Sequence, residues 1–301
     1  MSATAIYLTG ATASGKSALA LHLAKRLGGE IISVDSMQVY RGLDIGTAKP
    51  SAAEQAGVPH HLIDVAGLDE PFDAAQFVRL AKQAEAAIRS RDARPIFCGG
   101  TGLYFRALFD GLGESPPGDE PLRDELEAAP LDGLLAELAT KDPAAFESID
   151  RQNRRRVVRA VEVIRLTGKP YSSQRSGWDT LQAPGNLFCI TREGDDLTAR
   201  IHERVDAMFA QGLVAETQGL ARRGLRENRT ASQAIGYRQV LEHLDGGPGR
   251  TETVELVKAR TRQFAKRQRT WFRNQMICQP VEWAAGKSVD GCCERLLGML
   301  C

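Results

Sequence analysis

The sequence predicts an α/β fold, a parallel sheet core flanked by helices, with a helical insertion. Three observations predict it. A G-x-x-x-x-G-K-S motif stands between a strand pattern and a helix pattern, later strand patterns alternate with helix patterns, and the composition changes after Gly111. Strands that alternate with helices form parallel sheets covered on both faces. In such sheets the ligand-binding groups gather at the carboxyl ends of the strands.

The motif at residues 10–17 predicts a phosphate-binding loop (P-loop). It follows a strand pattern at 5–8 and precedes a helix pattern at 17–27. Glycines let backbone N–H groups turn toward a phosphate, Lys16 can reach its outer oxygens, and the Ser17 hydroxyl can bind Mg²⁺. The complete strand-loop-helix setting disfavours a glycine-rich turn that binds nothing. We expect phosphate contacts from Gly10, Ala11, Thr12, Ala13, Ser14, Gly15, Lys16 and Ser17.

The remaining patterns divide the chain into a core and an insertion. Strands are predicted at 30–34, 95–98 and 186–190. Helices are predicted at 74–90, 131–138, 154–166, 195–211, 214–223, 231–244 and 251–276. Prolines and glycines after Gly111 interrupt the α/β alternation. We therefore assign 1–112 and 187–301 to the P-loop core and 113–186 to a helical insertion domain.

Composition indicates a globular protein. The chain has 301 residues, of which 43% are hydrophobic and 26% charged, enough to build a core and a solvated surface. No apolar run approaches the ~20 residues of a membrane span, and no secretory leader pattern is present. The six cysteines form no C-x-x-C pair, so we expect reduced thiols in a cytoplasmic protein without a membrane partner.

Charge is distributed unevenly, although the formal net charge is only +1. Residues 113–147 are acidic, whereas 151–175 and 258–273 are basic. Two basic segments favour a polyanionic partner larger than a nucleotide, although each could be a solvated helix face. In the second segment, Trp271 and Phe272 align with Phe264 at helical spacing, which predicts that these aromatic side chains enter the core.

Two strand ends carry candidate chemical groups. Asp35 follows the strand pattern at 30–34, and it could bind magnesium, act as a base or cap the next helix. Thr101 lies in the segment Gly99-Gly100-Thr101-Gly102. Glycines there could permit a ligand to approach the backbone, or supply a turn with positive φ.

Seven blocks of this sequence resemble one known family. They are Gly-Ala-Thr-Ala-Ser-Gly-Lys-Ser at 10–17, Asp-Ser-Met-Gln-Val-Tyr-Arg-Gly at 35–42, Asp-Ile-Gly-Thr-Ala-Lys-Pro at 44–50, Pro-His-His-Leu-Ile-Asp at 59–64, Gly-Gly-Thr-Gly-Leu-Tyr at 99–104, Ala-Ile-Gly-Tyr-Arg-Gln at 234–239 and Lys-Arg-Gln-Arg-Thr-Trp-Phe-Arg at 266–273. The chain is similar to the tRNA dimethylallyltransferases, also called tRNA isopentenyltransferases. It departs from them at Ala11, where proline is common, and at Gln233-Ala234, where Arg-Cys is frequent.

The resemblance implies a reaction. In that family the P-loop holds the diphosphate of dimethylallyl diphosphate, and the dimethylallyl group passes to the exocyclic N6 amine of the adenine just 3′ of the anticodon. It implies that Asp35 takes the proton from the amine, while Lys16 and Mg²⁺ on Ser17 stabilise the leaving pyrophosphate. Thr101 lies near the bridging oxygen, and either Arg222 or Arg223 reaches the diphosphate; of the two, Arg223 is taken as the candidate.

The resemblance also implies the partner and its contacts. The partner is the anticodon stem-loop of tRNA, bound by a monomeric enzyme, with Gln38 reading a neighbouring base. The implied tRNA contacts are Asp35, Ser36, Met37, Gln38, Thr101, Arg123, Gln152, Asn153, Arg154, Arg155, Arg156, Gln233, Gly236, Tyr237, Arg238, Lys266, Arg267, Gln268, Arg269, Trp271 and Arg273. Two alternatives use the same features, an ATP-dependent small-molecule kinase and an RNA-binding module without chemistry.

Overall fold

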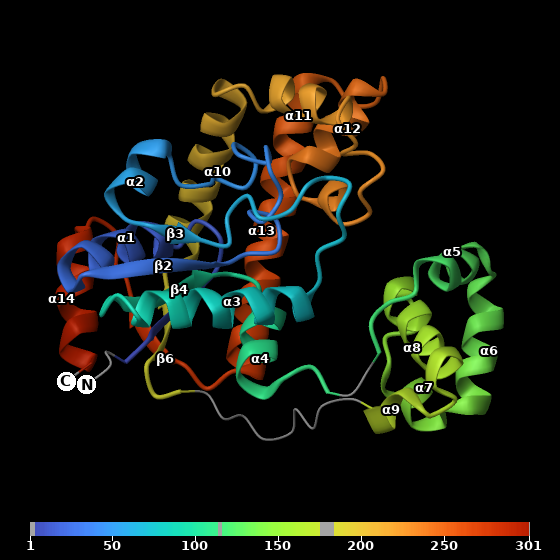
Figure 1. The fold of residues 1–301 in the computed structure, drawn as a ribbon. Coiled ribbons are helices and arrows are strands. Elements are labelled where there is room, and N and C mark those ends of the chain that lie inside the picture. The colour runs from blue at the N-terminus through green and yellow to red at the C-terminus, as the bar shows by residue number, and fades with distance from the viewer. Residues whose placement is uncertain (1–3, 114–115, 175–183, 301) are drawn as a thin grey trace. The chain divides into compact units, whose positions relative to one another are not determined.

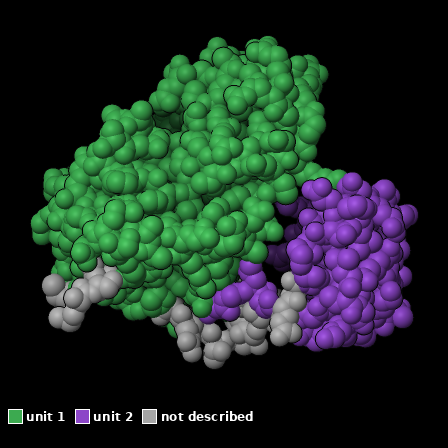
Figure 2. All heavy atoms as spheres, in the orientation of Figure 1, with its two compact units in different colours: residues 1–109, 182–301 green, residues 110–181 purple. Residues whose placement is uncertain are grey.

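The chain divides into two units in the computed structural model, which describes residues 4–113, 116–174 and 184–300. Unit 1 combines Met1–Phe109 with Gln182–Cys301, and unit 2 is Asp110–Leu181 (Figure 2). The sequence placed the insertion at 113–186. Residues 114–115 and 175–183 of that prediction lie outside the described residues.

A six-stranded parallel sheet forms the centre of unit 1 (Figure 1). Its strands are β1 (Ile6–Gly10), β2 (Gly29–Val34), β3 (His60–His61), β4 (Arg94–Gly99), β5 (Leu187–Thr191) and β6 (Gln279–Glu282). Their order across the sheet is β3-β2-β4-β1-β5-β6. This arrangement places β1 and the loop after it between β4 and β5, with every carboxyl end on one edge. The predicted α/β class with a parallel sheet is therefore confirmed.

Helices cover both faces of the sheet. In unit 1 they are α1 (Lys16–Leu27), α2 (Ala52–Gly57), α3 (Ala74–Arg89), α4 (Gly102–Asp110), α10 (Gly194–Ala210), α11 (Leu213–Ala221), the 3₁₀ turn η1 (Ala231–Gln233), α12 (Tyr237–Leu244), α13 (Arg250–Gln275) and α14 (Val289–Leu300). Within the described parts of the chain, no helix is long and apolar enough to cross a membrane.

The side chains of β1 point alternately to the two faces of the sheet, and each face is covered by its own core. Ile6 and Leu8 point to one face and enter a core with side chains of α1 and α14. Tyr7 points to the other face, where its ring stacks on Phe97 with centroids 4.8 Å apart and meets Phe109 edge-on. Successive strand side chains face opposite sides, so a strand covered on both faces is apolar throughout. The P-loop after β1 is thus anchored by two cores.

Unit 2 is helical. It contains α5 (Glu120–Ala128), α6 (Leu131–Lys141), α7 (Pro143–Ser148), α8 (Arg154–Thr167) and α9 (Tyr171–Gln174). The apolar stripe of α8, with Val157 and Val161, packs against Leu126, Leu134 and Leu138. Several basic side chains of this unit form ion pairs with its acidic ones. For example, the Arg165 guanidinium pairs with Glu125 and Glu137. Within the first basic segment, Arg151, Arg154, Arg159 and Arg165 therefore pair with carboxylates of their own unit, while Arg155 and Arg156 are exposed.

Several sequence-based boundaries were wrong. The helix predicted at 231–244 is interrupted, because Gly236 adopts φ +97° and α12 begins only at Tyr237. Strands β3 and β6 were missed because both are short and polar, and β6 contains Pro280, which is tolerated at a sheet edge. Helices α2, α4 and α14 were also missed. Helix α4 starts at Gly102, and it was not predicted because the glycine-rich segment 99–102 is typical of a turn.

Candidate active site

The P-loop wraps around the amino end of α1. Gly10 has φ +148°, Ala13 has φ +62° and Gly15 has φ +95°. A side chain on Gly10 would lie 2.6 Å from the Ile190 carbonyl oxygen, so this position requires glycine. Ala13 holds a left-handed conformation that costs a non-glycine residue on the order of 1 kcal/mol, and such strain is frequent at functional sites. The Lys16 ammonium donates to the Ala11 carbonyl at 3.2 Å.

Two arginines from distant segments brace this loop. The Arg200 Nε donates to the Ala13 carbonyl at 3.0 Å, and the Arg192 Nε donates to the Ser14 carbonyl at 2.7 Å. Arg192 is itself held by Asp196 and by the Trp283 ring, whose centroid lies 4.4 Å from the guanidinium carbon. With their carbonyls held by these arginines, the loop residues keep one conformation. Neither arginine was a candidate from the sequence.

A cavity of about 360 Å³ opens beside the loop. Its lining residues are Ala13, Gly15, Lys16, Ser17, Ala18, Arg200, Glu203 and Arg204. Burial lowers the pKa of Lys16, and Arg204 lowers it further, whereas Asp35 raises it. Burial also lowers the pKa of Arg204, which Asp35 partly offsets. Desolvated cations attract an anion more strongly than exposed ones, so this cavity is suited to a phosphate or diphosphate.

Sequence reasoning missed Arg204, although one signal could have found it. Arg200 and Arg204 are four residues apart on α10, which places both on one helix face. Arg223, the expected diphosphate ligand, is not among the residues that line this cavity, and its Nη1 would be 3.6 Å from a side chain on Gly42. Contact of Arg223 with a diphosphate stays a prediction.

Asp35 and Thr101 lie next to each other at the carboxyl ends of β2 and β4. The Ser36 backbone amide donates to Thr101 Oγ1 at 3.1 Å, and the Thr101 amide donates to the Val34 carbonyl at 3.2 Å. Asp35 Oδ1 accepts from the amides of Met37 at 2.8 Å and Gln38 at 3.3 Å. For Oδ2, the described residues supply no hydrogen-bond donor. One carboxyl oxygen therefore caps the backbone, and the other is available for chemistry.

The glycines around Thr101 do not supply a turn with positive φ, and the approach of a ligand to their backbone stays a prediction. A side chain on Gly99 would lie 1.9 Å from the Val34 carbonyl oxygen, and one on Gly102 would lie 2.2 Å from the Trp271 ring. The absence of a side chain at Gly99 and Gly102 thus leaves room for the Val34 backbone and for the Trp271 ring.

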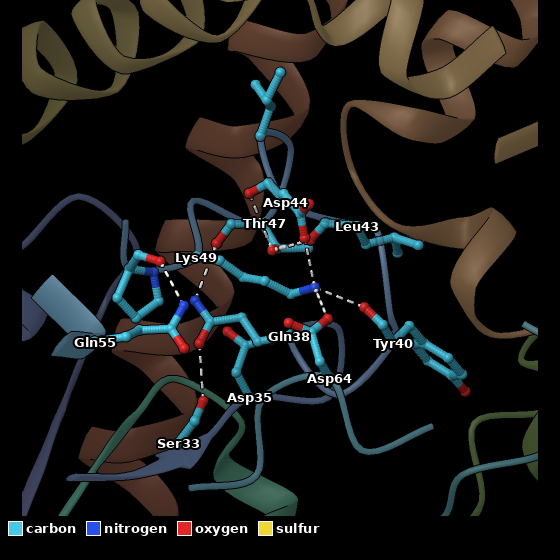
Figure 3. Close-up of polar contacts among 12 residues, drawn as sticks. Ser33, Asp35, Gln38, Tyr40, Leu43, Asp44, Thr47, Lys49, Gln55 and Asp64 are labelled. Atoms are coloured by element: carbon cyan, nitrogen blue, oxygen red, sulfur yellow. Dashed lines mark hydrogen bonds and ion pairs between the residues drawn. The ribbon is translucent and has the colours of Figure 1, made fainter. Parts of the chain in front are cut away.

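Gln38 is fixed by a loop that Lys49 holds in place (Figure 3). Its Nε2 donates to the Thr47 carbonyl at 3.2 Å and its Oε1 accepts from the Ser33 hydroxyl at 2.8 Å. The Lys49 ammonium donates to the carbonyl of Tyr40 at 2.7 Å, and it pairs with the carboxylates of Asp44 and Asp64. Only 4% of the Lys49 side chain is exposed. The orientation of the Gln38 amide is thus set by its surroundings.

Helix α13 presents a basic surface and a buried stripe. Lys266, Arg267, Arg269 and Arg273 are exposed. A hollow of about 520 Å³ on this helix is lined by Gln263, Lys266, Arg267, Thr270, Trp271, Asn274 and Gln275. The prediction that the three aromatic side chains enter the core holds for Phe272 alone, because Trp271 is half-buried and Phe264 is exposed. Gln268 is buried and bonds to two loops of unit 1.

The remaining predicted tRNA contacts lie near α12 and in unit 2. Near α12, Gln233 and Arg238 are exposed and joined by a hydrogen bond, whereas Tyr237 is fully buried, with its hydroxyl bound to Glu216. Any tRNA contact of Tyr237 would therefore use its backbone, as would a contact of Gly236.

In unit 2, Arg123 pairs with the buried Glu162, and Arg154 donates to carbonyls of residues 126–129. Gln152, Arg155 and Arg156 are exposed, and Asn153 caps α8. The tRNA contacts of these residues stay predictions.

The fold and the site define an α/β P-loop protein with a cationic, carboxylate-bearing pocket, as expected of an enzyme that displaces a phosphate group. The sequence model of the family "IPP transferase" matches residues 38–275. The chain belongs to this family.

Relatives named for the same activity match nearly the whole chain. It is 49% identical over 291 residues to tRNA dimethylallyltransferase 1 of Trichlorobacter lovleyi, covering 93% of each protein. The solved tRNA isopentenylpyrophosphate transferase of Bacillus halodurans has a TM-score of 0.71 and 39% identity, covering 100% of this chain and 96% of that one. A structure of a eukaryotic dimethylallyltransferase acting on tRNA has a TM-score of 0.79 and 27% identity, covering 97% and 77%. These names support prenyl transfer and not the kinase alternative.

Proposed function

We propose that the chain transfers a dimethylallyl group from dimethylallyl diphosphate to the N6 amine of the adenine immediately 3′ of the anticodon in certain tRNAs. The single observation that carries this proposal is that Lys16 and Arg204 line one cavity beside the P-loop, at the sheet edge where Asp35 follows β2. Two cations suit a diphosphate leaving group, and one carboxylate suits an amine that must lose a proton. The names of the relatives supply the substrates.

The diphosphate binds in the cavity beside the P-loop. Backbone amides at the amino end of α1, together with Lys16 and Arg204, surround its oxygens. As the bond between carbon 1 of the dimethylallyl group and the bridging oxygen breaks, negative charge grows on the pyrophosphate. Fixed cations in a cavity with little water stabilise this charge without reorganising. The loop therefore lowers the barrier mainly by stabilising the leaving group.

Asp35 receives the proton. The adenine amine attacks carbon 1, the new carbon–nitrogen bond forms, and one amine proton passes to Asp35 Oδ2. Oδ1 remains bound to the Met37 and Gln38 amides, so the carboxylate keeps its orientation during the transfer. Thr101 supports this loop through its bond to the Ser36 amide. The target base must leave the anticodon loop stack to reach this position.

Mg²⁺ is the expected cofactor, and the residues fit it. The Ser17 hydroxyl at the amino end of α1 would hold the ion together with substrate oxygens, and when bound the ion would add positive charge next to the pyrophosphate. Mg²⁺ usually needs only one or two protein oxygens at a substrate phosphate. It therefore does not require a cluster of three acidic, histidine or cysteine side chains, and none is found among the described residues.

The partner is the anticodon stem-loop of tRNA. Exposed cations on α13 suit contacts with a phosphate backbone. We further propose that the protein acts as a monomer in the cytoplasm, which fits the free thiols of its five described cysteines. Size-exclusion chromatography with light scattering, with and without tRNA, tests the monomer.

One experiment tests the function. The protein is incubated with unmodified tRNA, Mg²⁺ and dimethylallyl diphosphate labelled in the prenyl group, and the label is located by nuclease digestion and mass spectrometry. Label on the adenine 3′ of the anticodon is the expected result. Phosphoryl transfer from ATP without prenylation would identify a kinase, and RNA binding without any product would identify a binding module.

A further inference from the structure

Gln268 of α13 connects the P-loop to the loop that carries Thr101. Its Oε1 accepts a hydrogen bond from the Thr12 amide at 2.8 Å, and its Nε2 donates to the Gly100 carbonyl at 2.9 Å. The bonded residues are far apart in sequence, so these bonds hold together three segments that approach only in the folded chain. One side chain thereby links the diphosphate loop and the Thr101 loop.

The surroundings of Gln268 indicate that its amide is needed there. On α13, Ala265, Gln268 and Phe272 form one buried stripe, and the outer two are apolar. Gln268 is only 7% exposed. A buried amide costs free energy unless it is hydrogen-bonded, and an apolar side chain would avoid that cost. The neighbouring loop also makes room for it, because a side chain on Gly100 would lie 2.3 Å from the Gln268 Nε2.

We propose that Gln268 is a positioning residue for the transfer reaction, which sets the diphosphate loop and the Thr101 loop at a fixed spacing. This inference rests on the proposed function. The role of Gln268 thus differs from that of its exposed neighbours Arg267 and Arg269. A buried side chain that bonds to two loops cannot also contact tRNA. This role also implies that the Thr12 amide is bound to Gln268 and does not donate to the diphosphate.

Gln268→Met tests the bridge, because methionine fills a similar volume without hydrogen-bonding groups. Gln268→Glu keeps an acceptor for the Thr12 amide but, when ionised, cannot donate to Gly100. Arg269→Ala is the matched control at the adjacent exposed position. Four quantities are measured for each variant: pyrophosphate affinity without tRNA by calorimetry, tRNA affinity, kcat, and KM for dimethylallyl diphosphate.

For Gln268→Met we expect kcat to fall roughly 10- to 100-fold, as misplaced loops typically produce, and pyrophosphate affinity to fall several-fold. Gln268→Glu should also lose pyrophosphate affinity, because its carboxylate adds negative charge beside the diphosphate loop and cannot donate to Gly100. Both variants should bind tRNA within about twofold of wild type. Arg269→Ala should show the opposite pattern. Its tRNA affinity should fall while pyrophosphate affinity is kept.

Two results would overturn the inference: unchanged kcat and pyrophosphate affinity in Gln268→Met, or a loss confined to tRNA affinity. If that variant does not fold, Gly100→Ala replaces it, since its new methyl group displaces the Gln268 amide and should give the same loss. Absence of prenylated tRNA with the wild-type protein would instead refute the proposed function, and the pyrophosphate measurements would still test the bridge.

Discussion

Thr101 accepts a hydrogen bond from the Ser36 backbone amide at 3.1 Å, which joins the ends of β2 and β4 next to Asp35. The Asp35 carboxylate is held by its own loop, since its Oδ1 accepts from the amides of Met37 and Gln38. A base that is already fixed through one oxygen loses little entropy when its substrate arrives. Oδ1 of Asp35 therefore has a structural role, and Oδ2 remains for the proposed proton transfer.

Asp35→Asn should therefore leave the fold intact while removing the base. Asparagine retains an oxygen for the Met37 and Gln38 amides. We expect the rate of the chemical step to fall by roughly 10²–10⁴, with tRNA affinity nearly unchanged. Single-turnover kinetics with prelabelled substrate measures the step, and a near-normal rate would remove Asp35 from the role of base.

Arg204 and Arg223 should differ in their effect on diphosphate binding. Arg204 lines the cavity beside Lys16, whereas Arg223 lies beside Gly42. Arg204→Met should weaken pyrophosphate binding by at least roughly tenfold, because a partly buried charge-assisted contact is lost. Arg223→Met is the matched comparison in isothermal titration. A greater loss in Arg223→Met would show that the sequence-based assignment was the better one.

The exposed arginines of α8 should contribute salt-dependent tRNA affinity. Arg155 and Arg156 are exposed, whereas Arg154 is engaged with unit 2 carbonyls. Reversing the charge of Arg155 and Arg156 together should weaken tRNA binding and flatten its dependence on salt, since each lost phosphate contact lowers the slope by about 0.9 or less. Filter binding from low to high salt measures the slope. An unchanged slope would identify these arginines as a solvated face.

Acid should weaken unit 2 through Glu137. Hydrogen bonds from Arg165, and then from Lys141, hold the pKa of Glu137 at about 2, whereas glutamate in an unfolded chain titrates near 4.3. The pair therefore stabilises the unit fully above about pH 5, and this contribution is lost as the pH falls toward 2. Hydrogen exchange in α6 and α8 between pH 6 and pH 3 should show this loss. Glu137→Gln should reduce the pH dependence, and an identical dependence would contradict the assignment.

Lys49→Met should loosen the loop that supports Gln38. The ammonium donates to the Tyr40 carbonyl, which would lose its charged donor, while Asp44 and Asp64 are half exposed and can be hydrated. We expect a loss of about 1–3 kcal/mol in the free energy of unfolding, measured by urea titration. Lys49→Arg keeps the charge, but its planar group cannot reproduce the three contacts and should recover only part of the loss.

Local patterns predicted the parts of the site that lie within one segment. The P-loop is such a part, because its conformation follows from glycine positions and from the strand and helix that flank it. Asp35 and Thr101 were also found, since each directly follows a strand pattern, and parallel strands end on one edge. The break at Gly236 was missed because a single glycine within a helix pattern does not reveal its φ.

The alternation of strand and helix patterns, together with motif spacing, determined the α/β class, the P-loop and the candidate residues at the strand ends. The tertiary structure alone placed Arg200 and Arg204 at the loop and buried Gln268 between Thr12 and Gly100. The physical reason is distance along the chain. Backbone preferences act over a few residues, whereas these contacts join segments that approach only when two faces of the sheet are covered.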